Sequence, residues 1–316
     1  MSEAQPPLIE APKKKGPIIA AVVVVLAVIV GLAIFFTQKD DDETTNSSGE
    51  KVKVEKVKLG IVSAGEDYWD TLADAAKAEG IDLEIVNFAD YPQPNPALSE
   101  GEIDINQFQH IVYLADHNVK AGDDLTVLGS TAIYPLALYS DKYDDVAAIK
   151  DGETVIVPDD ESNQARALLV LQSAGLIKLN DGGSIYSTLA DIDKGASKVE
   201  VKALQADLIP ASLADVAAGF VNNDWVSKAG LKFEDAILKD DPTDPSALPY
   251  VNVFAVRGED KDNATLKKLV EIYQTNKDVQ AGVLKASSDT ATLVQTPVED
   301  LRTSLATVEA DSKKQN

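Results

Sequence analysis

Arginine and asparagine side chains in three segments could bind the charged groups of a small molecule. Helical spacing predicts a helix over residues 163–174, with Arg166 in its first turn. A guanidinium there could clamp a carboxylate, because it offers a fork of donors and the helix N-terminus favours anions. Asn222 and Asn252 are predicted at strand ends, where each amide supplies an acceptor and a donor. A surface ion pair is the alternative role for Arg166.

One segment in the first third of the chain is dense in aromatic and amide side chains. Tyr91 stands among turn-forming residues, a poor place for a core position, so we expect it in a pocket. Phe88 and Phe108 could serve either a pocket or the hydrophobic core. His110 and His117 are seven residues apart on a predicted helix, but two histidines without cysteine seldom complete a metal site. The sequence therefore predicts neither a metal site nor a cofactor.

Charge, cysteine content and missing motifs disfavour several classes of protein. The formal net charge of −23 would repel nucleic-acid phosphates, so no nucleic-acid partner is expected. The chain has no cysteine, so it has no disulfide, no thiolate nucleophile and no cysteine for a lipid anchor. It also lacks the Gly-x-Ser-x-Gly, His-Glu-x-x-His and Walker sequences of three large groups of enzymes. We therefore predict that the protein is not an enzyme.

The N-terminal region has the pattern of a membrane anchor. Residues 18–36 form an uncharged apolar run that, as a helix, would span about 28 Å, close to the hydrocarbon thickness of a bilayer. Lysines precede this run and acidic residues follow it, so the positive-inside rule places the N-terminus in the cytoplasm. We predict a cytoplasmic tail over 1–17, a single-pass anchor over 18–36, a flexible tether over 37–55 and an extracytoplasmic domain. A cleaved signal peptide is the alternative.

From residue 57 onward, short apolar runs alternate with helical patterns, which predicts an α/β fold. Asn95 followed by proline predicts the N-cap of a short helix. The last residues, from 310 onward, are polar and expected to fray. The predicted strands cover residues 57–62, 83–88, 125–129, 136–139, 154–157, 199–203, 217–221 and 250–256. The other predicted helices cover residues 109–119, 211–215 and 264–273, with another starting at 297. A further helix is predicted from a capping box at Ser63 and Glu66 to Gly80.

Five blocks of the sequence resemble the NlpA/MetQ family of methionine-type substrate-binding lipoproteins. They read FADYPQPNPAL (88–98), GEIDINQFQHIVYL (101–114), PDDESNQARAL (158–168), VNN (221–223) and YVNV (250–253). The similarity runs from about residue 58 to about residue 270. The family's lipid-modified cysteine has no counterpart here, and Tyr134 stands where the family often has glutamate. These departures leave methionine, its derivatives, a methionine-containing dipeptide and other apolar amino acids open as ligands.

The resemblance implies a type II periplasmic-binding fold, with two α/β lobes around a ligand cleft. Lobe one would comprise residues 56–138 and 254–316, and lobe two residues 139–253. The protein would be the extracytoplasmic substrate-binding component of an ABC importer and deliver an amino acid, most readily L-methionine, to permease and ATPase subunits. A surface adhesin, a sensor domain, or an enzyme on the same two-lobed fold are the alternatives.

The resemblance also assigns roles to seven residues. Those expected to hold the carboxylate and ammonium of an amino acid are Arg166, Asn222 and Asn252. Those expected to line the pocket for the ligand's side chain are Phe88, Tyr91, Phe108 and His110. Aromatic rings suit a thioether, because sulfur packs favourably against ring edges.

Overall fold

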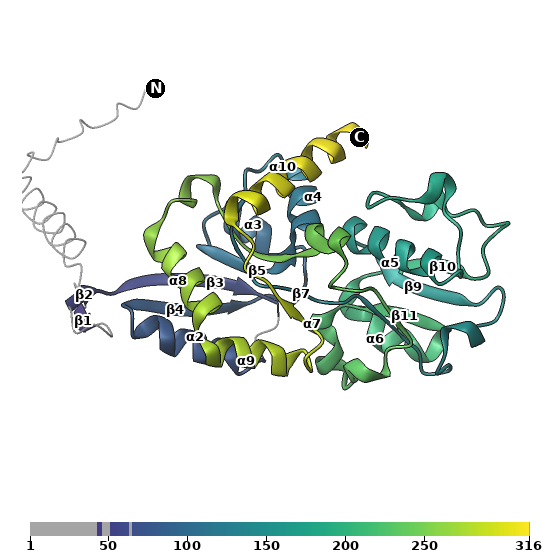
Figure 1. Cartoon of the computed structure of the whole chain (residues 1–316), viewed down its shortest axis with the longest axis horizontal. Helices are drawn as coiled ribbons and strands as arrows, with labels where there is room; N and C mark the ends of the chain where they lie inside the picture. The colour runs from purple at the N-terminus through teal and green to yellow at the C-terminus, as the bar shows by residue number, and fades with distance from the viewer. Residues whose placement is uncertain (1–42, 46–50, 63–64, 316) are drawn as a thin grey trace, which may run out of the picture. The chain divides into compact units, whose positions relative to one another are not determined.

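A five-stranded mixed sheet joins four strands from the first third of the folded region to one strand from much later in the chain (Figure 1). β3 (Glu55–Ile61) pairs in parallel with β4 (Ile81–Asn87) and β5 (Ile105–His110). β13 (Asn252–Val256) lies antiparallel between β5 and β6 (Thr126–Ser130). β13 is buried at four of its five positions, as expected of a strand inside a covered sheet.

A second five-stranded sheet, in the order β10-β9-β11-β8-β12, is built from the middle of the chain. β9 (Thr154–Pro158) pairs in parallel with β10 (Glu200–Leu204) and β11 (Ala218–Val221). β8 (Ala137–Tyr139) runs antiparallel to β11 and to β12 (Leu238–Lys239). Each sheet therefore contains strands that are distant in sequence.

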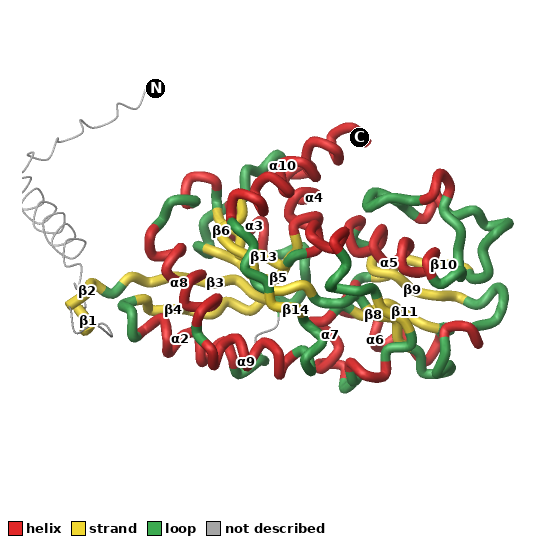
Figure 2. The backbone as a smooth tube through the Cα atoms, in the orientation of Figure 1, coloured by secondary structure: helices red, strands yellow, loops and turns green. Residues whose placement is uncertain are grey.

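Helices cover both faces of the first sheet (Figure 2). One face packs against leucine, valine and tyrosine side chains of α2 (Tyr68–Lys77), α8 (Ala264–Thr275) and α9 (Lys277–Ala286). The other packs against α3 (Pro94–Ser99), α4 (Ile111–Ala121) and α10 (Val298–Gln315). We call this sheet and its helices the first lobe.

The second sheet is also covered on two faces. α5 (Glu161–Ser173) buries Leu168 and Leu171 in the core on one side. The other side packs against two short helices, α6 (Ile209–Ser212) and α7 (Asn223–Val226). We call this sheet and its helices the second lobe.

The chain passes between the lobes twice. Residues 131–136, the first crossover, lead from β6 to β8 and include β7 (Ala132–Ile133), which pairs with β14 (Thr292–Leu293). Residues 240–251, the second crossover, lead from β12 to β13. The predicted lobe boundaries at 138/139 and 253/254 fall beside these crossovers and stay a prediction. Asn252, placed in lobe two by that prediction, begins β13 of the first sheet.

The computed structural model describes residues 43–45, 51–62 and 65–315. The predicted cytoplasmic tail and the anchor over 18–36 lie outside these residues. Within the predicted tether, β1 (Glu43–Thr45) and β2 (Lys51–Lys53) pair in an antiparallel ladder. Among the described residues, none of the helices is both long and apolar enough to cross a membrane.

β5 is the longest of the described strands that the sequence pattern did not predict. All six of its residues are buried although several carry amides, so no alternation of apolar and polar residues marks it. Asn95 explains how these amides are satisfied: its Oδ1 accepts from Asn106 at 2.9 Å and from Gln109 at 2.6 Å, and its Nδ2 donates to Gln109 at 2.7 Å. The N-cap prediction for Asn95 is therefore wrong, because Gln93 occupies that position of α3.

The C-terminal helix also differs from expectation. α10 continues to Gln315 rather than fraying at residue 310. Leu301, Leu305 and Val308 are spaced along one face of α10 and are buried in the core that α4 shares. This packing stabilises a helix that its polar sequence alone would not keep folded.

Candidate functional site

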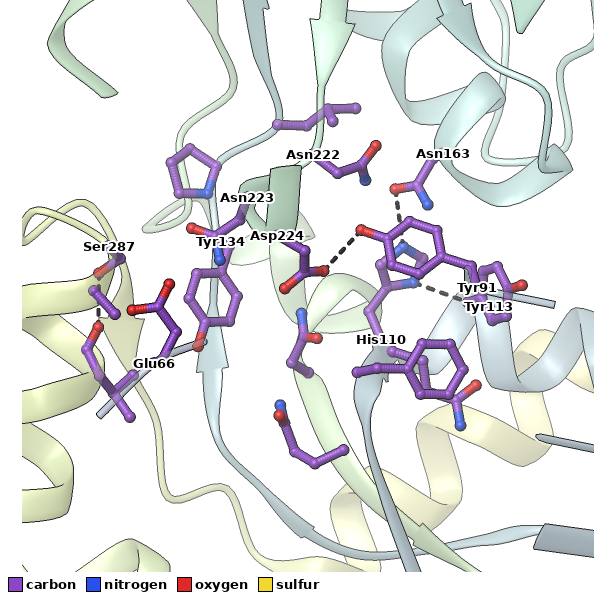
Figure 3. A pocket seen from close by; sticks show the side chains of 18 of the residues that line it. Glu66, Tyr91, His110, Tyr113, Tyr134, Asn163, Asn222, Asn223, Asp224 and Ser287 are labelled. Atoms are coloured by element: carbon purple, nitrogen blue, oxygen red, sulfur yellow. Dashed lines mark hydrogen bonds between the residues drawn. The ribbon is translucent and has the colours of Figure 1, made fainter. Parts of the chain in front are cut away.

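A pocket lies between the two lobes and takes its wall from both (Figure 3). Six of the seven residues that the sequence singled out line it: Tyr91, Phe108, His110, Arg166, Asn222 and Asn252. The β5–β13 register brings two of them together, because Asn252 is the partner of His110. Residues far apart in sequence therefore meet at the end of β5.

Phe88 is not among the residues that line the pocket. It follows β4 and is half-buried against cores on both sides of this segment. Its ring also approaches Gly60 of β3 so closely that a Cβ there would lie 3.0 Å from Phe88 Cε2. Phe88 thus packs against both cores, and its predicted contact with the ligand's side chain stays a prediction.

Two hydrogen bonds and a ring contact hold the Arg166 side chain in the pocket. Its Nε donates to Asp240 Oδ2 at 2.6 Å, and its Nη2 donates to the Tyr134 carbonyl at 2.8 Å. The guanidinium carbon lies 4.4 Å from the centre of the Tyr250 ring, a cation–π contact. Nη1 has no hydrogen bond to the part of the chain that the structure describes. One end of the guanidinium is therefore available to a ligand.

The position of Arg166 within α5 differs from the prediction. α5 begins at Glu161, so Arg166 lies in its second turn. The amides at the helix start face Asp160, whose Oδ1 accepts from the backbone of Asn163 at 2.9 Å. An anion at Arg166 would thus be held by the side chain and not by the helix N-terminus.

His110 is a neutral residue of the pocket wall. It caps α4 through Nδ1, which accepts from Tyr113 N at 3.1 Å, so the ring proton belongs on Nε2. Nε2 lies 3.3 Å from Oδ1 of Asn163 in the second lobe. Burial, with a smaller contribution from the Arg166 charge, lowers the pKa of His110 to about 3. His110 therefore carries no charge at neutral pH.

The two histidines do not share a site. His110 ends β5, whereas His117 lies within α4 and its Nε2 is 2.9 Å from Asp123 Oδ2. No group of three or more metal-ligating side chains gathers anywhere in the described residues.

Two amide oxygens of the pocket are buried without a partner. Asn222 and Asn223 each have an Oδ1 atom that is shielded from water and accepts no hydrogen bond from any residue that the structure describes. Both residues line the pocket, at the start of α7. A buried acceptor without a donor costs free energy, on the order of 1–3 kcal/mol, which a ligand N–H group would recover.

An acidic region forms another side of the pocket. Tyr91 in the first lobe donates to Asp224 Oδ2 in the second lobe at 2.7 Å. Burial, together with the Asp224 charge, raises the pKa of Glu66, and the same two causes raise the pKa of the Tyr91 hydroxyl. Figure 3 shows Glu66 and Asn223 toward one side of the cavity and Tyr91 and His110 toward the other.

Further contacts join the lobes around the pocket. Lys120 of α4 lies 2.7 Å from Glu161 of α5, and Lys228 Nζ donates to the Val62 carbonyl at 2.6 Å. With the Tyr91–Asp224 and His110–Asn163 contacts, they hold the lobes in a closed arrangement over the pocket.

The sequence comparison agrees with this architecture. The sequence model of the NlpA lipoprotein family matches residues 57–293. The chain belongs to the NlpA lipoprotein family. This confirms the resemblance predicted from the sequence blocks.

Relatives in the NlpA family cover most of the described chain. A protein named as a probable D-methionine-binding lipoprotein MetQ from Pasteurella multocida is 36% identical over 240 residues, which is 73% of this chain and 86% of the relative. The substrate-binding protein of a methionine transporter from Streptococcus pneumoniae superposes with a TM-score of 0.71 at 32% identity, covering 76% of this chain and 95% of that one. A nutrient-binding protein from Burkholderia cenocepacia, solved with methionine bound, has a TM-score of 0.70 at 34% identity and covers 75% and 99%. These neighbours confirm the two-lobed periplasmic-binding fold.

Sequence reasoning missed several pocket residues of this NlpA-family protein, including Glu66, Asn223 and Asp224. Asn223 and Asp224 directly follow the predicted Asn222, so the strand end there was a usable signal. Glu66 lies after β3, where the sequence suggests only a capping box with Ser63 for the next helix, and the fold brings it to the pocket.

The depressed pKa of His110 predicts a loss of stability in acid. Below pH 6.5 His110 becomes protonated in the unfolded chain, whereas in the folded chain it becomes protonated only near pH 3. The free energy of unfolding therefore falls as the pH is lowered through this window. At pH 5 this difference in protonation lowers the free energy of unfolding by about 2 kcal/mol. The measurement is urea unfolding of ligand-free wild type and His110→Gln at pH 7.5 and pH 5. Between pH 7.5 and pH 5, the free energy of unfolding should fall by about 2 kcal/mol less in the variant than in wild type. Equal losses would contradict the conclusion that His110 is uncharged in the folded protein.

Proposed function

We propose that this NlpA-family protein is the extracytoplasmic substrate-binding component of an ABC importer. Its ligand is an amino acid, and L-methionine is the leading candidate. One observation carries the proposal: a buried guanidinium with a free end and two unpartnered amide oxygens line the same pocket. A zwitterion needs donors for its carboxylate and acceptors for its ammonium. The pocket offers both in the space between the lobes.

The carboxylate would bind Arg166. Arg166 is one of three arginines in the chain, and its side chain is only 6% exposed. A charge-assisted hydrogen bond in such a shielded place is stronger than the same bond at the surface. The neutral state of His110 leaves Arg166 without a competing cation on that side.

The ammonium would bind the amide oxygens of Asn222 and Asn223, with Asn252 nearby in the lining. The Asp224 carboxylate, next in the chain and also in the lining, adds a negative charge on this side. Asn223 extends the set of backbone contacts that the sequence predicted.

The ligand's side chain would pack among aromatic rings. The rings of Phe108 and Tyr113 are 5.7 Å apart at 78°, and those of Tyr91 and Phe108 are 6.1 Å apart. Val283 and Ala286 add apolar surface from α9. A flexible thioether suits such a wall, because sulfur gains from contact with ring edges.

The proposed role is binding without turnover. The relatives are named as binding proteins, and one of them is the substrate-binding protein of a transporter. The closed lobes would present the bound amino acid to permease and ATPase subunits, and lobe opening would release it.

Calorimetric titration of the full chain, purified in mild detergent and stripped of ligand by unfolding and refolding, tests this function. L-Methionine should bind at one site per chain. Arg166→Ala should weaken binding by about 100-fold or more, because a buried charged partner is lost.

Arg302→Lys is the matched control for Arg166→Lys, since Arg302 lies in α10 away from the lining residues. Arg166→Lys should weaken binding and Arg302→Lys should not. D-Methionine, methionine sulfoxide, a methionine dipeptide and leucine complete the panel. No binding of any of these ligands, or full affinity in Arg166→Ala, would contradict the proposal.

We further propose that residues 18–36 anchor the protein in the cell membrane as a single-pass helix, in place of the cysteine that the chain lacks. The support is the uncharged apolar run with its flanking charges. The full chain should stay in the membrane pellet after an alkaline carbonate wash, and a variant lacking 18–36 should leave it. A control lacking 37–50 should remain in the pellet. Release of the full chain by the wash would contradict the anchor.

A further inference from the structure

Both hydrogen bonds that the Arg166 guanidinium makes to described residues go to a crossover between the lobes. Nε binds Asp240 of the second crossover, and Nη2 binds the Tyr134 carbonyl of the first. The Tyr250 ring, also in the second crossover, lies against the guanidinium. The residue proposed to hold the ligand's carboxylate is therefore held by the segments that must bend when the lobes move apart.

Asp240 connects the two crossovers to each other. Its Oδ1 accepts from Leu136 N at 2.8 Å, while its Oδ2 accepts from Arg166 Nε at 2.6 Å. Its own N–H donates to the Leu136 carbonyl at 3.3 Å. One carboxylate thus joins the end of the first crossover, the start of the second, and α5.

The contacts of Asp240 decide which edge of Arg166 a ligand can reach. Nε and Nη2 are both occupied, and they form the side edge of the guanidinium fork. Nη1 is left for the pocket. If the Asp240 contact were lost, the guanidinium could turn its side edge away from the crossovers, and Nη1 would no longer point into the pocket.

We infer that Asp240 is a positioning residue that orients Arg166 toward the ligand's carboxylate and couples that contact to the closed geometry of the crossovers. This inference rests on the proposed function. In the closed arrangement the crossovers hold Arg166 with Nη1 toward the pocket. Opening of the lobes moves Asp240 and Tyr134 relative to α5, and the guanidinium then loses its fixed orientation. Affinity for the ligand's carboxylate is therefore high only when the lobes are closed.

Charge and position predict opposite effects for Asp240→Asn, which makes the variant decisive. If Asp240 only neutralised Arg166, its removal would strengthen the attraction for a ligand carboxylate. If it positions Arg166, binding weakens, because one amide oxygen cannot serve both Arg166 and Leu136 N. We expect affinity for L-methionine to fall about tenfold, the size of coupling found within a shared hydrogen-bond network.

The control is Asp241→Asn, which removes the same charge one residue away. The Asp241 carboxylate is bound by Thr243 and is exposed, so affinity should stay within about twofold of wild type. Asp240→Glu keeps the charge but shifts it by one methylene, and it should weaken binding while the thermal melt stays close to that of wild type. This variant keeps the test sound if Asp240→Asn folds poorly.

The test that Asp240 acts through Arg166 is a double-mutant cycle in the full chain, with L-methionine affinity as the readout. In the Arg166→Lys background, Asp240→Asn should change affinity by less than about twofold, because the fork that Asp240 aligns is gone. Unchanged or tighter binding in the single Asp240→Asn variant would overturn the inference. So would an equal loss in both backgrounds. A wild type that binds no methionine would instead overturn the proposed function.

Discussion

The buried positive charge of Arg166 constrains the region between the lobes. Removing a guanidinium from water costs several kcal/mol unless it is paired and hydrogen-bonded. Here Asp240, the Tyr134 carbonyl and the Tyr250 ring compensate the charge. All three belong to the crossovers, so satisfying this charge also fixes the path that the chain takes between its two sheets.

The pocket depends equally on pairing between strands that are far apart in sequence. β13 returns from the second lobe and inserts between β5 and β6. Its antiparallel register places Asn252 opposite His110, and a shift in the ladder follows between Val253 and Phe254. A slip by one residue would turn these side chains to the other face of the sheet. The binding wall is thus a consequence of a buried, strongly specified register.

Local sequence patterns predicted much of this structure. Apolar runs located most strands of both sheets, and six of the seven site residues proposed from the family resemblance line the pocket. The exceptions have physical causes. β5 has a buried polar sequence without alternation, and Phe88 packs against both cores. The partners of Arg166 could not be predicted, because Asp240 and Tyr134 approach it only through the crossovers.

The most direct test of the account is a crystal structure of the full chain with L-methionine bound. The account predicts that a carboxylate oxygen of the ligand lies about 3 Å from Arg166 Nη1, while Asp240 stays on Nε. It predicts the ligand's ammonium at the same distance from the amide oxygens of Asn222 and Asn223. A ligand with its carboxylate away from Arg166, or one that displaces Asp240 from Nε, would contradict the account.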